Sequence, residues 1–387
     1  MKITEVTTRT FLHPTTSSHD DLGHPIRGPA HDVYESLLTI GTDEGAAGYS
    51  FGASPNLVDQ VIAPMLVGND PFDRERLWQR MAISQGMIRD FHPQELAAVD
   101  LALWDLAGRY LGQPIHKLLG AYRDKVPAYA SSPLGTFGGG ALDTPEAYAE
   151  LAAACVKRGF KGFKLHTWFP SGPDQELDPK RDVEACQAVR DAVGPDIDLM
   201  LDCWHFYSRE HALYIGRELD RLGYYWFEEP MDEYSMSSYQ WLAEQLDTPI
   251  LGPERAQGNH RVRAEWIKAE ACDIVRVALG HEGGLTPAMK TVHLAESFGM
   301  AAEPHGPADQ CVHLCGATAA AKYLEVGSNP SWEWTTPPWL KSDITLMDAD
   351  GYVPMPRGPG SGLEIDFDYI DDHAVDPPAT LRLQRQK

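Results

Sequence analysis

The sequence predicts an α/β protein, a (β/α)8-type barrel with an α+β capping domain. Three observations support this fold class. From about residue 126 onward, eight short apolar runs alternate with amphipathic stretches of helical length. No Gly-rich phosphate-binding motif follows the first strand, which counts against an open Rossmann-type sheet. The 387 residues are 43% hydrophobic and 23% charged, which provides enough apolar material for a large core.

Residues 1–125 are expected to form most of the capping domain. Residues 3–12 and 33–40 are predicted strands, and the second ends in a Gly-Thr-Asp-Glu-Gly turn after which strand pairing resumes. The stretch 15–30 between them is rich in Pro, Gly, Ser, His and Asp, so it is predicted to be a loop. A helical pattern follows, and residues 96–108 are apolar on nearly every face, which predicts a buried helix.

Residues 126–345 are expected to form the barrel, and residues 346–387 to pack back on the capping domain. The predicted barrel strands are 126–131, 162–166, 199–202, 225–228, 250–252, 274–278, 300–303 and 323–326. The predicted helices between them include 146–158, 181–193, 209–222 and 286–298. Strands that alternate with helices in this way are typical of a parallel barrel.

The charge and the cysteines exclude several classes of function. With 33 Lys and Arg against 56 Asp and Glu, the formal net charge is −23, so nucleic acid and anionic membranes are not expected as partners. The excess carboxylate leaves room for a cation. The six cysteines form no CxxC pair and are expected to be small core residues. No apolar leader or membrane-length apolar run occurs, so we expect a cytoplasmic protein.

Three carboxylates point to a metal. In barrels of this type, catalytic side chains lie at the carboxyl ends of the strands. Asp202, Glu228 and Glu254 stand at the ends of three consecutive predicted strands, one βα unit apart. They should therefore lie side by side, where they would repel one another unless a cation joined them. A hard divalent ion suits such oxygen ligands, and Mg²⁺ is the first choice.

The chain resembles the enolase superfamily, mandelate racemase subgroup, over essentially its full length. The motifs that carry the resemblance are Asp100-Leu-Ala-Leu-Trp-Asp-Leu-Ala-Gly, Lys164-x-His166, Leu201-Asp202, Phe227-Glu228-Glu229-Pro230, Gly252-Pro-Glu254, Gly283-Gly284, Pro304-His305-Gly306 and a Gly-Pro-Gly tail. The resemblance implies a modified (β/α)7β barrel, whose eighth strand lacks a full partner helix. It also implies Mg²⁺ on Asp202, Glu228 and Glu254, and abstraction of a proton α to a carboxylate through an enediolate.

The proton transfers need an acid or base on each side of the substrate. A base must reach the α-carbon and have a pKa near the operating pH. Lys164 and His166 on the second barrel strand should face His305 on the seventh across the mouth of the barrel. We assign leaving-group protonation and α-proton exchange to His305. Support of the carboxylate and the opposing proton transfer are assigned to the Lys164 and His166 side.

Two positions depart from the pattern of the subgroup. Lysine is common where His166 stands, and a histidine there has an alternative role in binding the substrate or Glu228. An aspartate is common at the end of the sixth strand, where it orients the histidine of the seventh, but this chain has Ala278. Glu282 and Glu303 are the two candidates to orient His305 instead.

Substrate contacts are expected from further residues around the mouth, which are Glu325, Arg276, His24, Glu229 and Trp204. Two roles are open for Arg276: it binds a second acidic group of the substrate, or it forms a structural ion pair. The polar stretch 15–31, which includes His24, corresponds to the loop that closes over the substrate in this family. Its polarity favours a polyhydroxylated acid.

The function expected from these residues is Mg²⁺-dependent dehydration of an acid sugar to a 2-keto-3-deoxy acid. A racemase, epimerase or cycloisomerase would use the same enediolate. A non-catalytic sugar-acid binding barrel and a metal-dependent hydrolase are more distant alternatives, and the His-x-His of the latter is absent from the first barrel strand. The partner is a small-molecule carboxylate. A homo-oligomer is also expected, with exposed Trp168, Phe169, Trp332 and Trp334 at interfaces or under the lid.

Overall fold

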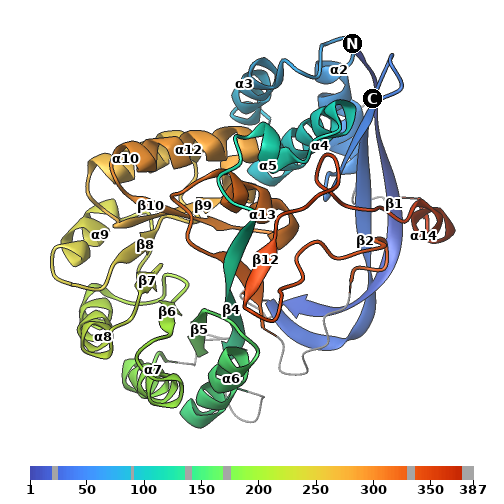
Figure 1. Cartoon of the computed structure of the whole chain (residues 1–387). Coiled ribbons are helices and arrows are strands. Elements are labelled where there is room, and N and C mark those ends of the chain that lie inside the picture. Colours follow the sequence, from blue (N-terminus) through green and yellow to red (C-terminus); the bar gives the residue numbers. More distant parts are fainter. Residues whose placement is uncertain (20–24, 89–90, 136–141, 169–175, 329–335, 377–387) are drawn as a thin grey trace.

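The computed structural model describes residues 1–376 apart from 20–24, 89–90, 136–141, 169–175 and 329–335. Within this part of the chain, eight parallel strands form a nearly closed barrel in the order β10-β9-β8-β7-β6-β5-β4-β11 (Figure 1). They are β4 (Lys125–Gly135), β5 (Gly162–Trp168), β6 (Asp198–Asp202), β7 (Trp226–Glu228), β8 (Ile250–Gly252), β9 (Ile274–Ala278), β10 (Ala301–His305) and β11 (Leu324–Gly327). The predicted barrel is confirmed, and all eight predicted strands are present.

Helices surround the strands on the outside of the barrel (Figure 1). They are α6 (Pro145–Lys157), α7 (Pro179–Val193), α8 (Arg209–Leu222), α9 (Met236–Ala243), α10 (Asn259–Lys268), α11 (Leu279–Glu282), α12 (Leu285–Ser297) and α13 (Ala308–Ala317). In the described chain after β11, no barrel helix follows. β12 (Tyr352–Pro354) instead pairs antiparallel with β4, and α14 (Phe367–Asp372) lies beside β1. The modified (β/α)7β form is therefore confirmed.

Local sequence explains where these helices begin and end. The side chains of Thr144, Asp178 and Ser208 accept hydrogen bonds from the first turns of α6, α7 and α8, as good N-cap residues do. α8 ends at Gly223 in the left-handed conformation, which a glycine adopts without steric cost. The apolar face of α8, including Ile215 and Leu219, is buried against the barrel.

An apolar layer closes the barrel beneath its mouth. Tyr129, Met200, Trp226, Leu251, Ile274 and Tyr323 form one buried cluster. These residues lie on or next to six different strands, and large side chains filling a barrel in this way make it a packed core. The functional groups therefore lie above a closed floor. The six cysteines are free and buried, which fits their expected role in the core.

The capping domain begins with a meander of β1 (Ile3–His19), β2 (Pro25–Thr42) and β3 (Ala47–Phe51). The prediction of a loop over 15–30 was wrong, since the ladder continues through Ser17 opposite Arg27. A ladder needs only backbone groups, so the polar side chains that suggested a loop do not interrupt it. Residues 20–24, including His24, lie outside the described residues.

Short helices follow the meander and lead to the long helix that joins the cap to the barrel. They are α1 (Pro55–Leu57), the π-helical turn η1 (Val58–Ile62), α2 (Ala63–Leu66), α3 (Arg74–Gln85), α4 (Pro93–Leu111) and α5 (Ile115–Leu118). α4 is buried along most of its length, as predicted. Its Asp100 accepts hydrogen bonds from the backbone N–H (2.8 Å) and hydroxyl (2.6 Å) of Thr286 at the start of α12. The domain boundaries at 125/126 and 345/346 stay predictions.

Two further expectations concern surfaces. Trp168 was expected to be exposed, but it is only 2% exposed. It packs against Tyr148, with ring centroids 5.1 Å apart, and its indole N–H donates to the carbonyl of Leu142 (2.9 Å). The prediction that Trp168 lies at an interface was therefore wrong, and Phe169, Trp332 and Trp334 lie outside the described residues. No helix in the described chain has the length and apolar character needed to span a membrane.

Candidate active site

Charged side chains gather at the carboxyl ends of the barrel strands. We call this group the mouth cluster, which consists of Lys164, His166, Asp202, Glu228, Glu254, Arg276, His305 and Glu325. The register brings the first members together, because His166 pairs with Asp202 in the β5–β6 ladder and Asp202 pairs with Glu228 in the β6–β7 ladder. Glu254 follows β8 by two residues, and His305 ends β10. All eight members are candidates from the sequence.

Lys164 binds carboxylates from three other strands. Its Nζ lies 3.0 Å from Asp202 Oδ2, from Glu228 Oε2 and from Glu325 Oε1. Burial opposes the charge on the ammonium, but Glu228 and Glu325 outweigh it and hold the pKa of Lys164 well above its usual value. Carboxylates from three strands therefore favour the charged form of Lys164 in this arrangement.

Arg276 is the second buried cation of the cluster. Its Nη2 lies 2.8 Å from Glu228 Oε1 and 2.8 Å from Glu325 Oε2, and its Nε lies 3.5 Å from Glu254 Oε2. Since the guanidinium is fully buried and already meets three carboxylates, it makes the internal ion pair that was one of its two predicted roles. Binding of an acidic group of the substrate by Arg276 stays a prediction.

His166 has acceptors on both sides of its ring. Its Nδ1 lies 2.8 Å from the carbonyl oxygen of Ser132, and its Nε2 lies 3.0 Å from Asp202 Oδ2. The Ser132 hydroxyl also accepts from the backbone N–H of His166 (2.9 Å), while the Tyr148 hydroxyl donates to the carbonyl of His166. Both the ring and its backbone are thus held in one orientation at the end of β5.

His305 is the more accessible of the two mouth histidines, with 36% of its side chain exposed against 10% for His166. Its Nδ1 lies 3.0 Å from Glu325 Oε2, and its Nε2 lies 3.4 Å from Glu254 Oε1. Burial lowers the pKa of His305, but Glu254 and Glu325 outweigh this effect and raise it above the usual value. The ring therefore has carboxylate partners from two strands.

The carboxylate that orients His305 is Glu325, so the expectation of Glu282 or Glu303 was wrong. Ala278 pairs with His305 in the β9–β10 ladder and has no group to offer. Glu282 instead accepts from the Thr291 hydroxyl (2.6 Å), and Glu303 accepts from the backbone N–H groups of Lys322 and Tyr323. Both of these glutamates are committed to neighbouring segments, because they point away from the mouth cluster toward those donors.

Three residues just beyond the ends of β6 and β7 have left-handed backbones, namely Trp204 (φ 48°), His205 (φ 55°) and Glu229 (φ 43°). This conformation is strained for residues with a Cβ, and such strain is concentrated at functional sites. Glu229 is buried, and its Oε2 lies 3.7 Å from His205 Nδ1. Burial, together with the nearby Glu254 and Glu233, raises the pKa of Glu229 well above its usual value. A buried carboxyl group with a raised pKa therefore lies beside the predicted metal ligands.

Sequence reasoning missed several residues at the mouth. Ser132 lies one residue beyond the first predicted strand, and a search of strand ends would have found it. His205 lies three residues after Asp202. Arg255 follows Glu254 directly, is 41% exposed at its side chain, and places its guanidinium 4.5 Å from the centre of the Trp204 ring. His24, the remaining sequence candidate, lies outside the described residues.

The donor set of the mouth cluster fits a hard divalent cation. Asp202, Glu228 and Glu254 are at most 5% exposed, come from successive strand ends, and offer only carboxylate oxygens, which Mg²⁺ prefers. Glu228 Oε1 is buried, and apart from its ion pair with Arg276 (2.8 Å) it has no hydrogen-bond partner among the described residues. In this arrangement Lys164 and Arg276 lie between the carboxylates, and among the described residues no three His, Cys, Asp or Glu side chains are grouped as around a bound metal ion.

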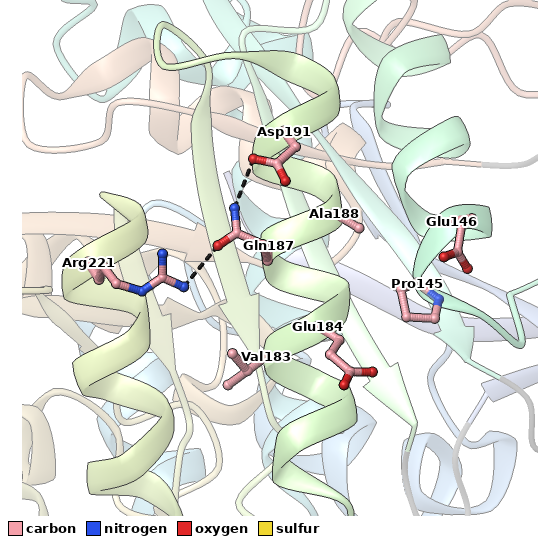
Figure 2. Close-up of a pocket in the computed structure, with 8 residues that line it drawn as sticks. All are labelled: Pro145, Glu146, Val183, Glu184, Gln187, Ala188, Asp191 and Arg221. Atoms are coloured by element: carbon pink, nitrogen blue, oxygen red, sulfur yellow. Dashed lines mark hydrogen bonds between the residues drawn. The ribbon is translucent and has the colours of Figure 1, made fainter.

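A separate hollow lies on the outside of the barrel, between α6, α7 and α8 (Figure 2). Figure 2 shows Gln187 at its centre, with hydrogen bonds to Asp191 (2.8 Å) and from Arg221 (2.9 Å). Its lining residues belong to the helical layer and include none of the mouth cluster. The hollow therefore does not belong to the candidate active site.

Comparisons with known proteins agree with the fold and the order of the motifs. The family described as enolase C-terminal domain-like matches residues 147–369, and the N-terminal domain of the mandelate racemase and muconate lactonizing enzyme family matches residues 30–120. The crystal structure of D-glucarate dehydratase from Agrobacterium tumefaciens, complexed with magnesium, has a TM-score of 0.94 and 49% sequence identity, and the match covers 97% of this chain and 100% of that one.

Curated relatives include enzymes of two reaction types. L-talarate/galactarate dehydratase of Salmonella typhimurium is 29% identical over 86% of this chain and 81% of its own length. D-galactarolactone cycloisomerase of Agrobacterium fabrum is 29% identical over 98% of this chain and 100% of its own length. The two matched domains, the barrel order and the placement of the mouth cluster lead to one conclusion: the chain belongs to the enolase superfamily, in the family of mandelate racemase and muconate lactonizing enzymes.

Proposed function

We propose that the protein is a Mg²⁺-dependent dehydratase that converts an acid sugar to a 2-keto-3-deoxy acid. The observation that carries the proposal is the mouth cluster, in which three carboxylates on successive strands lie between His166 on β5 and His305 on β10. β5 and β10 are not neighbours in the barrel, so the two histidines approach the mouth from different sides. The 49% identity to a D-glucarate dehydratase supports the same reaction.

Asp202, Glu228 and Glu254 would hold the ion. When bound, Mg²⁺ draws negative charge from the substrate carboxylate and so makes the α-proton more acidic. We assign Lys164, which lies between three carboxylates, to support of the charge on the substrate carboxylate. We assign the acid or base role on the β5 side to His166, whose Nε2 faces Asp202 at 3.0 Å.

His305 supplies the proton transfer from the opposite side of the substrate. With Nδ1 engaged by Glu325, the nitrogen that exchanges a proton with the substrate is Nε2. In a dehydration, one histidine takes the α-proton, the bond from the β-carbon to its hydroxyl breaks, and a proton from the other histidine makes the leaving group water. The resulting enol then becomes the 2-keto acid. We assign the leaving-group proton to His305 Nε2.

A diacid sugar is the substrate class that we test first. Glucarate, talarate and galactarate, named for relatives of this chain, carry a second carboxylate. Arg276 is enclosed by protein carboxylates, whereas Arg255 at the same mouth is 41% exposed, with its Nε 4.0 Å from Glu229 Oε2. We assign Arg255, packed on Trp204, to the second carboxylate of the substrate.

A cycloisomerase or racemase is the second candidate, because two opposed histidines serve these reactions as well and one relative is a cycloisomerase. One experiment separates the candidates. The protein is incubated with Mg²⁺ and a panel of aldaric acids, aldonic acids and aldarolactones in deuterated water. 2-Keto acid formation supports the dehydratase, and deuterium exchange without keto acid supports an isomerase. Binding without exchange would show a sugar-acid binding protein and contradict both.

Two further properties stay proposals. A homo-oligomer is expected, and light scattering at concentrations that give full activity tests it, because a mass equal to the 42.9 kDa of one chain would contradict it. We also propose a cytoplasmic location, which fractionation of the producing cells tests.

A further inference from the structure

The segment 253–256, which follows β8 and includes Glu254, is held by a buried carboxylate. Glu233, in the loop after β7, accepts hydrogen bonds from three consecutive backbone N–H groups of this segment. The donors are Glu254 (2.5 Å), Arg255 (2.7 Å) and Ala256 (2.5 Å). Glu233 is 8% exposed. A single carboxylate thus meets every N–H of the segment that follows its proline.

A buried guanidinium holds the carbonyl groups of the same segment. Arg263 on α10 is fully buried, and it donates to the carbonyls of Ala256 (2.5 Å), Glu254 (2.6 Å) and Pro253 (3.2 Å). Its Nε lies 3.6 Å from Glu282 Oε1, which ties the guanidinium to the segment after β9. Glu233 and Arg263 together therefore make six hydrogen bonds to four residues.

The sheet itself cannot orient Glu254. β8 ends at Gly252, so no ladder reaches the segment 253–256, and a loop without such partners would leave the carboxylate free to turn. Hydrogen bonds that involve a charged partner are stronger than neutral ones, and they gain further strength in a buried site. Glu233 and Arg263 therefore hold the backbone at Glu254, while its carboxylate itself contacts Arg276 (3.5 Å) and His305 (3.4 Å).

We infer that Glu233 and Arg263 are positioning residues that set the affinity of the mouth cluster for Mg²⁺ by fixing Glu254. The inference rests on the proposed function, in which Glu254 is a ligand. Neither residue is expected to touch the substrate. Groups that orient metal ligands typically change metal affinity by about 10- to 100-fold when they are replaced.

The test measures Mg²⁺ binding by titration calorimetry in wild type, Glu233→Gln and Arg263→Lys. We expect a dissociation constant at least about tenfold higher in both variants, because the amide adds a donor that faces N–H groups and the ammonium cannot make the forked contact. Asp105→Asn is the matched control. Asp105 is a buried carboxylate that also accepts backbone N–H groups, but it lies in α4, so this variant should lose thermal stability and keep the wild-type dissociation constant.

Different results overturn different claims. Wild-type Mg²⁺ affinity in a folded Glu233→Gln, judged by circular dichroism, would overturn the inference and leave the proposed function intact. If Glu233→Gln does not fold, Glu233→Asp and Arg263→Lys decide in the same way, since both keep the charge. Absence of Mg²⁺ binding in wild type, or binding that Glu254→Gln leaves unchanged, would overturn the proposed function and the inference together.

Discussion

The buried carboxylates of α4 and those at the mouth of the barrel have different partners. Asp100 and Asp105 in α4 accept hydrogen bonds from backbone N–H groups, including those of Thr286 (2.8 Å), Tyr49 (2.9 Å) and Ser361 (2.7 Å). Within the described residues, the Glu228 carboxylate at the mouth contacts only side chains, mainly those of Lys164 and Arg276. Both sets are buried, but they differ in how far the main chain holds them: Asp202 also accepts from the backbone N–H of Trp204 (3.2 Å), whereas the Glu228 carboxylate is held by side chains alone.

The difference separates structural from functional carboxylates. A backbone N–H is fixed by the fold, so a carboxylate bound to it joins two segments permanently, as Asp100 joins the cap to α12. A carboxylate paired only with side-chain cations is not bound to the main chain, so it is free of that constraint when a metal ion or a substrate replaces the pairing. By this criterion Glu233 and Glu303 are structural, although they lie near strand ends. The predictions below test the criterion, starting with the largest effect.

Glu254→Gln should reduce kcat by a factor of about 1,000 or more and leave the fold intact, because the amide removes the charge that a divalent ion requires. Activity assays and circular dichroism measure the two effects. Chelation with EDTA should abolish wild-type turnover, and Mg²⁺ should restore it. Full activity in EDTA would show that the mouth carboxylates serve no metal.

His305→Asn should reduce both α-deuterium exchange and product formation by about 100- to 10,000-fold, the usual range for loss of a general acid or base. His166→Asn should reduce the same two rates. The readouts are mass spectrometry of recovered substrate and a keto-acid assay. Wild-type rates in His305→Asn would assign the chemistry to β5 alone.

Asp105→Ala should lower the free energy of unfolding by about 1–3 kcal/mol, because it leaves the partly buried backbone N–H groups of Tyr49 and Ser361 without their acceptor. The kcat of the folded fraction should stay at the wild-type value. Urea unfolding and steady-state kinetics of the same preparation measure both. A large loss of kcat with unchanged stability would contradict the distinction between the two regions.

Asp182 is a buried carboxylate whose hydrogen-bond partner is neutral, since it accepts from the hydroxyl of Tyr207. Burial raises its pKa to about 7. A raised carboxyl pKa means that the folded state holds the proton of Asp182 more tightly than the unfolded state does. The protonated carboxyl therefore stabilises the fold at low pH. This contribution to the free energy of unfolding, at most about 4 kcal/mol, is lost as the pH rises from about 4 to about 7. Asp182→Asn should flatten that part of the Tm profile. An unchanged profile would show that Asp182 does not contribute.

The barrel could be predicted from the sequence because its signals are local. The predicted strands 250–252 and 274–278 coincide with β8 and β9, since each is a short, mainly apolar and buried run, and the first is bounded by prolines. The loop predicted over 15–30 failed for the opposite reason. There, composition suggested a loop, but pairing of β1 with β2 continues through backbone groups that composition does not report.

The mouth residues could be predicted by type and position, but not by partner. Strand-end spacing identifies Asp202, Glu228 and Glu254, because the length of a βα unit is regular. It does not show that Glu325 and not Glu282 or Glu303 contacts His305, or that Arg276 meets three carboxylates. Those contacts join strands that are far apart in the sequence, and side-chain length and direction decide them.

The sequence by itself therefore determined the order of strands and helices, the end of the barrel at which charge collects, and the family. Periodicity and motif spacing are properties of short segments, so they can be recognised without knowing what packs against those segments. The tertiary structure decided which buried carboxylates accept from the main chain and which are paired with side-chain cations. Two residues such as Glu233 and Arg263 converge on one segment only when separate βα units close around the barrel.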